Sequence, residues 1–149
     1  MNAIRLKPPH IAFALIALSV GVHLLFIRDT RIGFRCYACA GCVFLVGLAI
    51  MTWAWALFRR SGTPIRPTDT ATSLVTDGPF RISRNPMYLG IVIMLLALAW
   101  GVGTLPMLIG PVGFFLVMSF VFIPYEEQRL QALFGESYAT YTRRVRRWL

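Results

Sequence analysis

The chain of 149 residues carries a formal net charge of +9, and 57% of its residues are hydrophobic while only 14% are charged. Because soluble domains contain roughly 45–50% apolar residues, this composition argues against a water-soluble protein and indicates an integral membrane protein. The excess of arginine fits basic segments that lie at anionic lipid head groups, so we expect membrane lipids, and no nucleic acid, as partners.

Long uncharged runs predict an all-α, multi-pass transmembrane helical protein. Residues 10–27 contain no Lys, Arg, Asp or Glu, and residues 36–58 form a second such run. At about 1.5 Å per residue, the second run can cross a hydrocarbon core of about 30 Å. A third run, residues 87–125, is too long for a single span.

The third run is expected to fold back on itself. Gly101 and Pro106 bracket a glycine-containing stretch near its middle, which supplies a turn and a helix start. We therefore expect a helical hairpin with arms at residues 87–101 and 105–124. This gives about four spans in one domain that covers residues 1–149.

The distribution of basic residues predicts the orientation in the membrane. Twelve of the 15 Lys and Arg residues lie in the N-terminal stretch, in the loop 59–86 and in the C-terminal tail, while the loop between the first two spans holds Arg28, Arg31 and Arg35. Cytoplasmic loops carry the excess of basic residues. We therefore expect both termini on the cytoplasmic side of a bacterial inner membrane.

The cysteines and histidines are not expected to hold a metal. Cys36, Cys39 and Cys42 are fewer than the four donors that structural zinc sites usually take, and they lie among small residues that let membrane helices pack closely. His10 and His23 have no partner at ligand spacing. We interpret them as neutral side chains that bond to a neighbouring helix or lie at the interface.

A polar motif ends the loop before the third run and contains Arg81, Arg84, Asn85, Pro86 and Tyr88. The residue before a proline avoids the helical region, so Asn85 should cap the next helix and Pro86 should take its first position. Arg84 and the positive end of the helix dipole then lie at the membrane surface, with Tyr88 one turn inside. Such a corner suits the carboxylate or phosphate group of a ligand. The alternative is that the motif only caps a transmembrane helix and anchors it at the interface through Arg and Tyr.

A second polar segment begins where the last span ends, at Glu126 and Glu127. Adjacent side chains on a helix point about 100° apart, so one acid can face a pocket while the other holds a neighbouring Arg. The aromatic and aliphatic residues that follow at helical spacing are Phe134, Tyr138, Tyr141, Val145 and Trp148. We expect a cytoplasmic amphipathic helix that either lies in the interface or closes as a flap over the first motif.

In their order along the chain, these motifs resemble the isoprenylcysteine carboxyl methyltransferase and phospholipid methyltransferase family of integral membrane enzymes. The likeness covers about residues 62–145. Its motifs lie at residues 74–81, 84–90, 126–127 and 134–141. The likeness implies that segments 76–90 and 125–148 form one cofactor site.

The resemblance implies S-adenosyl-L-methionine as cofactor, methyl transfer to a lipophilic substrate, and catalytic roles for Arg84 and Glu127. The cofactor-binding residues that it implies are Arg81, Arg84, Asn85, Pro86, Tyr88, Glu126, Glu127, Tyr138 and Tyr141. Asn85 stands where the carboxyl methyltransferases commonly have His. The acceptor is therefore left open between an isoprenylcysteine-type carboxylate and a lipid head group.

Two alternatives remain open from the sequence. Membrane reductases of the sterol type resemble this family in their C-terminal half but bind NADPH, and they often carry Cys-x-x-Lys-Tyr-Gly where this chain has Leu130 to Gly135. This difference argues against a reductase. The second alternative is a non-catalytic membrane scaffold, in which the charged residues serve only to set the topology.

Overall fold

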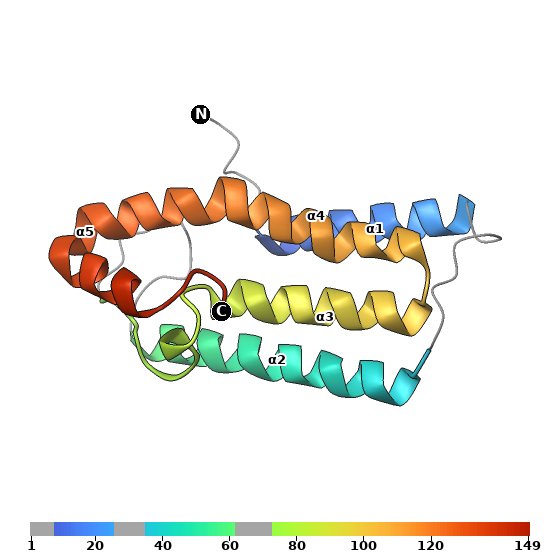
Figure 1. The fold of residues 1–149 in the computed structure, drawn as a ribbon, viewed down its shortest axis with the longest axis horizontal. Helices are drawn as coiled ribbons and strands as arrows, with labels where there is room; N and C mark the ends of the chain where they lie inside the picture. Colours follow the sequence, from blue (N-terminus) through green and yellow to red (C-terminus); the bar gives the residue numbers. More distant parts are fainter. Residues whose placement is uncertain (1–7, 26–34, 62–72) are drawn as a thin grey trace.

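The computed structural model describes residues 8–25, 35–61 and 73–149 and forms an elongated helical bundle (Figure 1). Its α-helices are α1 (Pro8–Leu25), α2 (Tyr37–Arg60), α3 (Pro86–Val102), α4 (Ile109–Val117) and α5 (Ile123–Arg144). Its shorter helical segments are the 3-10 turns η2 (Gly78–Arg81) and η3 (Leu105–Leu108) and the π-helical η4 (Met118–Phe122). Within the described ranges there is no strand, so the all-α prediction is confirmed.

Three helical stretches of the described chain are long and apolar enough to cross a membrane. They are α1, α2 and a continuous stretch from Leu105 to Arg144, and α3 is a shorter apolar helix. The expected hairpin is present, because α3 ends at Val102 and the chain turns through the C-cap residue Gly103 into η3. Gly103 has φ of 68°, a left-handed conformation that glycine adopts without steric cost.

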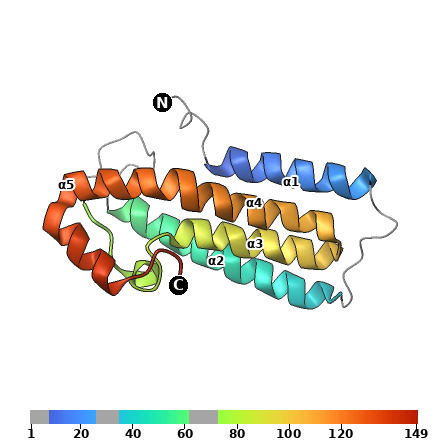
Figure 2. The same ribbon diagram turned by 45° about the horizontal axis from the view of Figure 1, so that its top comes forward.

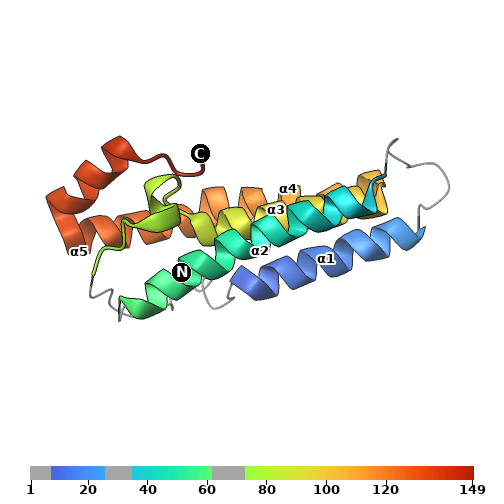
Figure 3. The ribbon, with the colours of Figure 1, turned by 90° about the horizontal axis from the view of Figure 1, so that it is seen from below.

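Helix α1 packs mainly on α4 and not on α2, its neighbour in the chain. α2 packs along α3, α3 along α4, and α4 along α1 (Figure 2). Seen from below, α1 runs beside the bundle and leaves one face of α2 without a helical neighbour (Figure 3). The end of α2, the start of α3 and the start of α5 lie at the same end of the molecule (Figure 1).

Two glycines bring α2 and α3 into backbone contact. A Cβ on Gly47 would lie 2.7 Å from the carbonyl oxygen of Gly90, and a Cβ on Gly90 would lie 2.6 Å from the carbonyl oxygen of Gly47. Small residues at such a crossing let membrane helices approach closely. This contact fixes α3 only two residues after Tyr88, so it also positions the first polar motif.

The apolar core connects the bundle to its polar end. Phe114, Met118 and Ile123 are fully or almost fully buried, and Tyr88 and Trp148 pack against the cluster that they form. The ring of Tyr88 meets that of Phe114 edge-on, with centroids 6.3 Å apart. The aromatic part of Tyr88 is therefore held by the core while its hydroxyl faces the polar end.

Two features at the other end of the bundle bear on the cysteines and histidines. The Nδ1 atom of His23 lies 3.0 Å from the Oγ1 atom of Thr104, so this histidine bonds to a neighbouring segment as predicted. Cys36 and Cys39 form a disulfide, a pairing that the sequence did not predict, and Cys42 is free and exposed.

The C-terminal segment departs from one continuous helix. Gly135 has φ of 49° and bends α5, so that its second half folds back toward the start of α3 (Figure 1). The helix ends at Arg144, and Val145 is extended. The prediction that one helical face continues to Trp148 is therefore wrong beyond Arg144. The backbone of the tail pairs there with the loop before α3, where Ser83 lies opposite Arg146.

Candidate functional site

The polar end of the bundle brings together residues from α3, α5 and the C-terminal tail. A salt bridge of 3.2 Å joins the Nη1 atom of Arg84 to the Oε1 atom of Glu127. Only 15% of the Arg84 side chain and 19% of the Glu127 side chain are exposed. The two motifs, about 40 residues apart in sequence, therefore meet in a partly desolvated ion pair, where electrostatic interactions exceed those at an open surface.

Glu127 also binds the tail. Its Oε2 atom accepts a hydrogen bond of 2.6 Å from Nη2 of Arg147, and its Oε1 atom accepts one of 3.2 Å from Nε of Arg147. This fork-like geometry gives both direction and strength to the pair. The hydrogen bonds to Glu127 hold the pKa of Arg147 above its usual range. One carboxylate thus bridges two guanidinium groups that would otherwise repel each other.

Glu126 has a different partner. The hydroxyl of Tyr88 donates a hydrogen bond of 2.6 Å to the Oε1 atom of Glu126. Adjacent acids on one helix therefore serve different neighbours, which agrees with the angle of about 100° between consecutive helical positions. Glu126 lies against the first turn of α3, whereas Glu127 lies between Arg84 and the tail.

The tail is attached to the loop that precedes α3. The amide of Arg84 donates to the carbonyl oxygen of Arg146 at 3.0 Å, and the side-chain amide of Asn85 donates to the carbonyl oxygen of Arg147 at 2.9 Å. Asn85 is the N-cap residue of α3, but its side chain makes no capping bond, which corrects the expectation. The Asn85 side chain donates instead to the carbonyl oxygen of Arg147. Pro86 begins the helix as predicted.

Tyr138 and Tyr141 face inward from the folded-back half of α5. Tyr138 is 3% exposed, and the two tyrosine ring centroids lie 6.2 Å apart. The hydroxyl of Tyr141 donates a hydrogen bond of 2.7 Å to the carbonyl oxygen of Phe80. This bond holds the folded-back half against η2. Arg81 does not join the cluster, because its exposed side chain pairs with Asp77.

Trp148 ties the end of the tail to the membrane-spanning part. Its indole N–H donates to the hydroxyl of Ser119 at 3.1 Å, and its ring lies 4.8 Å from that of Phe115. Ser119 belongs to the π-helical segment, an irregularity that often occurs at functional sites. The sequence did not single out Arg147, Trp148 or Ser119 for these contacts.

One buried donor at the site lacks a partner. The Nε atom of Arg84 is inaccessible to solvent and makes no hydrogen bond within the described chain. Buried polar atoms are normally paired. The hydroxyl of Tyr138 lies within hydrogen-bonding reach of the same guanidinium, and Nε is the donor that the described chain leaves unpaired. The donor set of this corner therefore fits an anionic group such as a carboxylate.

The phospholipid methyltransferase family model matches residues 35–137 of the chain. Over 78 residues the chain is 41% identical to protein-S-isoprenylcysteine O-methyltransferase B of Arabidopsis thaliana, an alignment that covers 48% of this chain and 36% of that protein. Over 63 residues it is 38% identical to an uncharacterized protein of Haemophilus influenzae, covering 42% of this chain and 100% of that protein. No solved structure matches.

The plant relative is much longer than the aligned part, since this chain spans little more than a third of its length. The family match, in contrast, includes α2, the α3–α4 hairpin and the acidic pair at the start of α5. It covers well over half of the 149 residues. The chain therefore belongs to the phospholipid methyltransferase family, as the sequence motifs predicted.

Proposed function

We propose that this membrane protein is an S-adenosylmethionine-dependent methyltransferase that methylates a lipophilic acceptor. The observation that carries the proposal is the meeting of Arg84 with Glu127 beside Glu126, in a chain of the phospholipid methyltransferase family. The cofactor's amino-acid part has an ammonium and a carboxylate group. It therefore needs an anionic and a cationic partner close together, and this corner supplies both.

Arg84 holds the carboxylate in this proposal, and one of the two acids, Glu126 or Glu127, holds the ammonium. The unpaired Nε atom of Arg84 supports the first assignment, because it leaves a buried donor for a ligand oxygen. When bound, the cofactor supplies a methyl group on a positively charged sulfur. Tyr88, Tyr138 and Tyr141 are proposed to face that charge, since aromatic rings attract cations.

The charge balance of the cluster supports this cofactor over NADPH. Arg84 and Arg147 both pair with Glu127, and Glu126 lies beside it with a hydrogen bond from Tyr88, so cationic and anionic groups lie together at the site. A zwitterionic amino-acid group can exchange partners with such a cluster without adding net charge. A dinucleotide brings several phosphate charges into the site, which requires an excess of cationic partners.

The chain's own residues position the reactants and exclude water. Methyl transfer requires in-line approach of an acceptor to the methyl group, so orientation and desolvation are the main demands. Asn85 and Tyr141 hold the tail and the folded-back half of α5 over the start of α3. This cover is proposed to shield the reacting groups from the aqueous phase while the acceptor enters from the bilayer.

The acceptor is proposed to be an isoprenylcysteine-type carboxylate or a lipid head group. The name of the plant relative and that of the family support these two classes. A carboxylate is already nucleophilic and needs no strong base. Incorporation of labelled methyl into a farnesylated cysteine analogue, compared with phosphatidylethanolamine, distinguishes the two.

Separate titrations of the purified protein with S-adenosylhomocysteine and NADPH test the cofactor. We expect saturable binding of S-adenosylhomocysteine alone. Binding of NADPH alone would identify a reductase. Binding of neither ligand would favour the non-catalytic scaffold.

Single substitutions then test the site. Charge-assisted hydrogen bonds contribute about 1.5–3 kcal/mol each, so Arg84→Ala and at least one of Glu126→Gln and Glu127→Gln should weaken S-adenosylhomocysteine binding roughly 10- to 150-fold. Glu136→Gln is the matched control, because its ion pair with Arg143 is largely exposed. If the three site variants bind as the parent does, the pocket lies elsewhere.

A further inference from the structure

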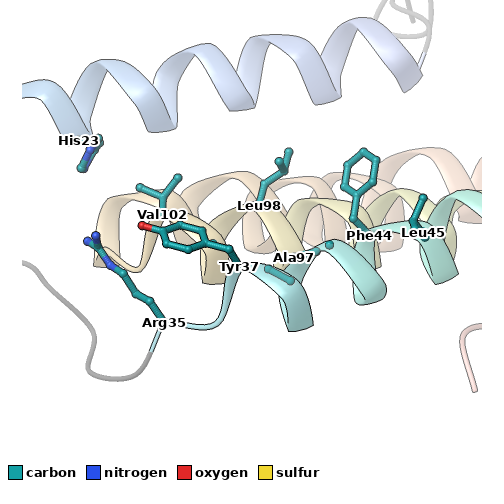
Figure 4. Close-up of a pocket in the computed structure, with 11 residues that line it drawn as sticks. His23, Arg35, Tyr37, Phe44, Leu45, Ala97, Leu98 and Val102 are labelled. Carbon is teal, nitrogen blue, oxygen red and sulfur yellow. The ribbon is translucent and has the colours of Figure 1, made fainter.

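A second candidate site lies at the opposite end of the bundle from Arg84 and Glu127. A cavity of about 840 Å³ opens there between the end of α1 and the adjoining faces of α2 and α3. Figure 4 shows His23 on the α1 side, and Arg35 and Tyr37 at the start of α2. This volume falls in the range of about 300–1,000 Å³ that is typical of small-molecule sites.

The walls of the cavity are apolar and follow helical spacing. Tyr37, Ala40, Gly41, Phe44 and Leu45 line it from α2, at positions i, i+3, i+4, i+7 and i+8 of one face. Ala40 is buried on this face and lies close to Gly101 of α3, where a Cβ would be 3.6 Å away, whereas Tyr37 and Leu45 are exposed. Helix α1 packs on α4 and does not cover them. Figure 4 shows Tyr37, Phe44 and Leu45 along this side of the cavity.

The depth of the cavity matches one leaflet of a bilayer. From Tyr37 to Leu45 the lining covers eight helical steps, or about 12 Å at about 1.5 Å per residue. Half of a hydrocarbon core of about 30 Å is about 15 Å. A transmembrane helix of a partner needs a groove along the whole span, whereas a lipid acyl chain of a single leaflet needs only this depth.

The mouth of the cavity carries positive charge. Arg35 lies there over Gly103, where a Cβ would come within 2.5 Å of its Nε atom, so the glycine makes room for the arginine stem. Apolar walls under a cationic mouth complement a molecule that has a hydrocarbon chain and an anionic head group.

We propose that this cavity binds an anionic glycerophospholipid, with one acyl chain between α1 and α2 and its phosphate at Arg35. Tyr37, at the same mouth and 70% exposed, provides the amphipathic ring that membrane interfaces favour. The bound lipid is not the methyl acceptor, because the candidate methyl-transfer site lies at the other end of the bundle. Its role is to fill the face between α1 and α2 that the protein leaves open.

Native mass spectrometry of the detergent-solubilised protein tests this site with three probes. They are phosphatidylglycerol, phosphatidylcholine with the same acyl chains, and glycerol 3-phosphate. One basic residue near a membrane surface is worth about 1 kcal/mol, so the parent should prefer phosphatidylglycerol over phosphatidylcholine by about five-fold. Arg35→Gln should remove that preference, because it weakens phosphatidylglycerol binding more than binding of the zwitterionic phosphatidylcholine. Glycerol 3-phosphate, which lacks the chain, should not bind.

A filled cavity provides the decisive variant. A Cβ on Gly41 would meet no atom within 4 Å, so the side chain of Gly41→Leu enters the cavity without displacing its surroundings. Phosphatidylglycerol binding should fall at least about ten-fold. Gly21→Leu is the matched control, because Gly21 lies on α1 in equally open space and does not line the cavity.

Three results would overturn the lipid site. They are unchanged lipid binding by Gly41→Leu, equal binding of the two phospholipids by the parent, and binding of glycerol 3-phosphate as tight as that of phosphatidylglycerol. S-adenosylhomocysteine is titrated in parallel, and its affinity for Gly41→Leu should equal that of the parent. Loss of lipid binding and loss of the methyltransferase assignment are thereby distinguished.

Discussion

The glycine contact between α2 and α3 permits a quantitative prediction for Gly90→Ala. A Cβ at Gly90 would lie 2.6 Å from the carbonyl oxygen of Gly47 and 2.9 Å from the amide nitrogen of Met51, whereas ordinary contacts begin at 3.4 Å. The helices must therefore separate by about 0.8 Å, the difference between 3.4 and 2.6 Å. Overpacking costs up to about 3 kcal/mol, and replacing a helical glycine by alanine returns about 0.5–1 kcal/mol. A net loss of about 2 kcal/mol remains.

Thermal unfolding in detergent, followed by circular dichroism, measures this loss. A domain of this size loses about 2–4 °C in Tm per kcal/mol, so Gly90→Ala should lower Tm by about 4–8 °C. Gly41→Ala is the control on α2, because its Cβ would meet nothing within 4 Å and only the gain in helix propensity remains. If Gly90→Ala is as stable as Gly41→Ala, the backbone contact does not hold the two helices together. The same displacement should weaken S-adenosylhomocysteine binding, since Tyr88 lies two residues away.

Three further substitutions or fusions test the site and the topology. Tyr141→Phe leaves the Phe80 carbonyl without its donor and should destabilise the protein by about 1–3 kcal/mol in chemical unfolding, and an unchanged midpoint would show the bond to be dispensable. Asn85→Asp replaces the amide donor by a carboxylate facing a carbonyl oxygen, so limited proteolysis should cleave the tail sooner than in the parent. Reporter fusions at Leu149 and within residues 28–35 should report opposite sides of the membrane, and a cytoplasmic 28–35 loop would contradict four spans.

Much of the fold could be predicted from the lengths of the uncharged runs. A run of 39 residues cannot cross a bilayer once, and its central glycines mark where it turns, so the α3–α4 hairpin follows from length and local turn chemistry. The hairpin in turn places Tyr88 and Glu126 at one end of the molecule. Their hydrogen bond could not be predicted, because it depends on which face of each helix points inward.

The C-terminal tail shows where local pattern fails. Helical spacing of apolar residues continues to Trp148, yet the helix ends at Arg144 because the tail backbone pairs with Ser83 and Arg84. Such long-range pairing leaves no periodic signal in the sequence. For the same reason Arg147 was indistinguishable from its basic neighbours, which set topology equally well.

The position of Glu127 between two arginines would let the proposed site take a ligand without releasing the tail. Arg84 and Arg147 share the carboxylate of Glu127, which offsets the repulsion between the two guanidinium charges. In the proposed site, a ligand carboxylate at Arg84 would compete with Glu127 for that guanidinium. Glu127 then keeps Arg147 as its partner, and the tail stays attached through the Asn85 bond and the Arg84 amide. The corner can therefore admit an anionic group while the cover over the site remains closed.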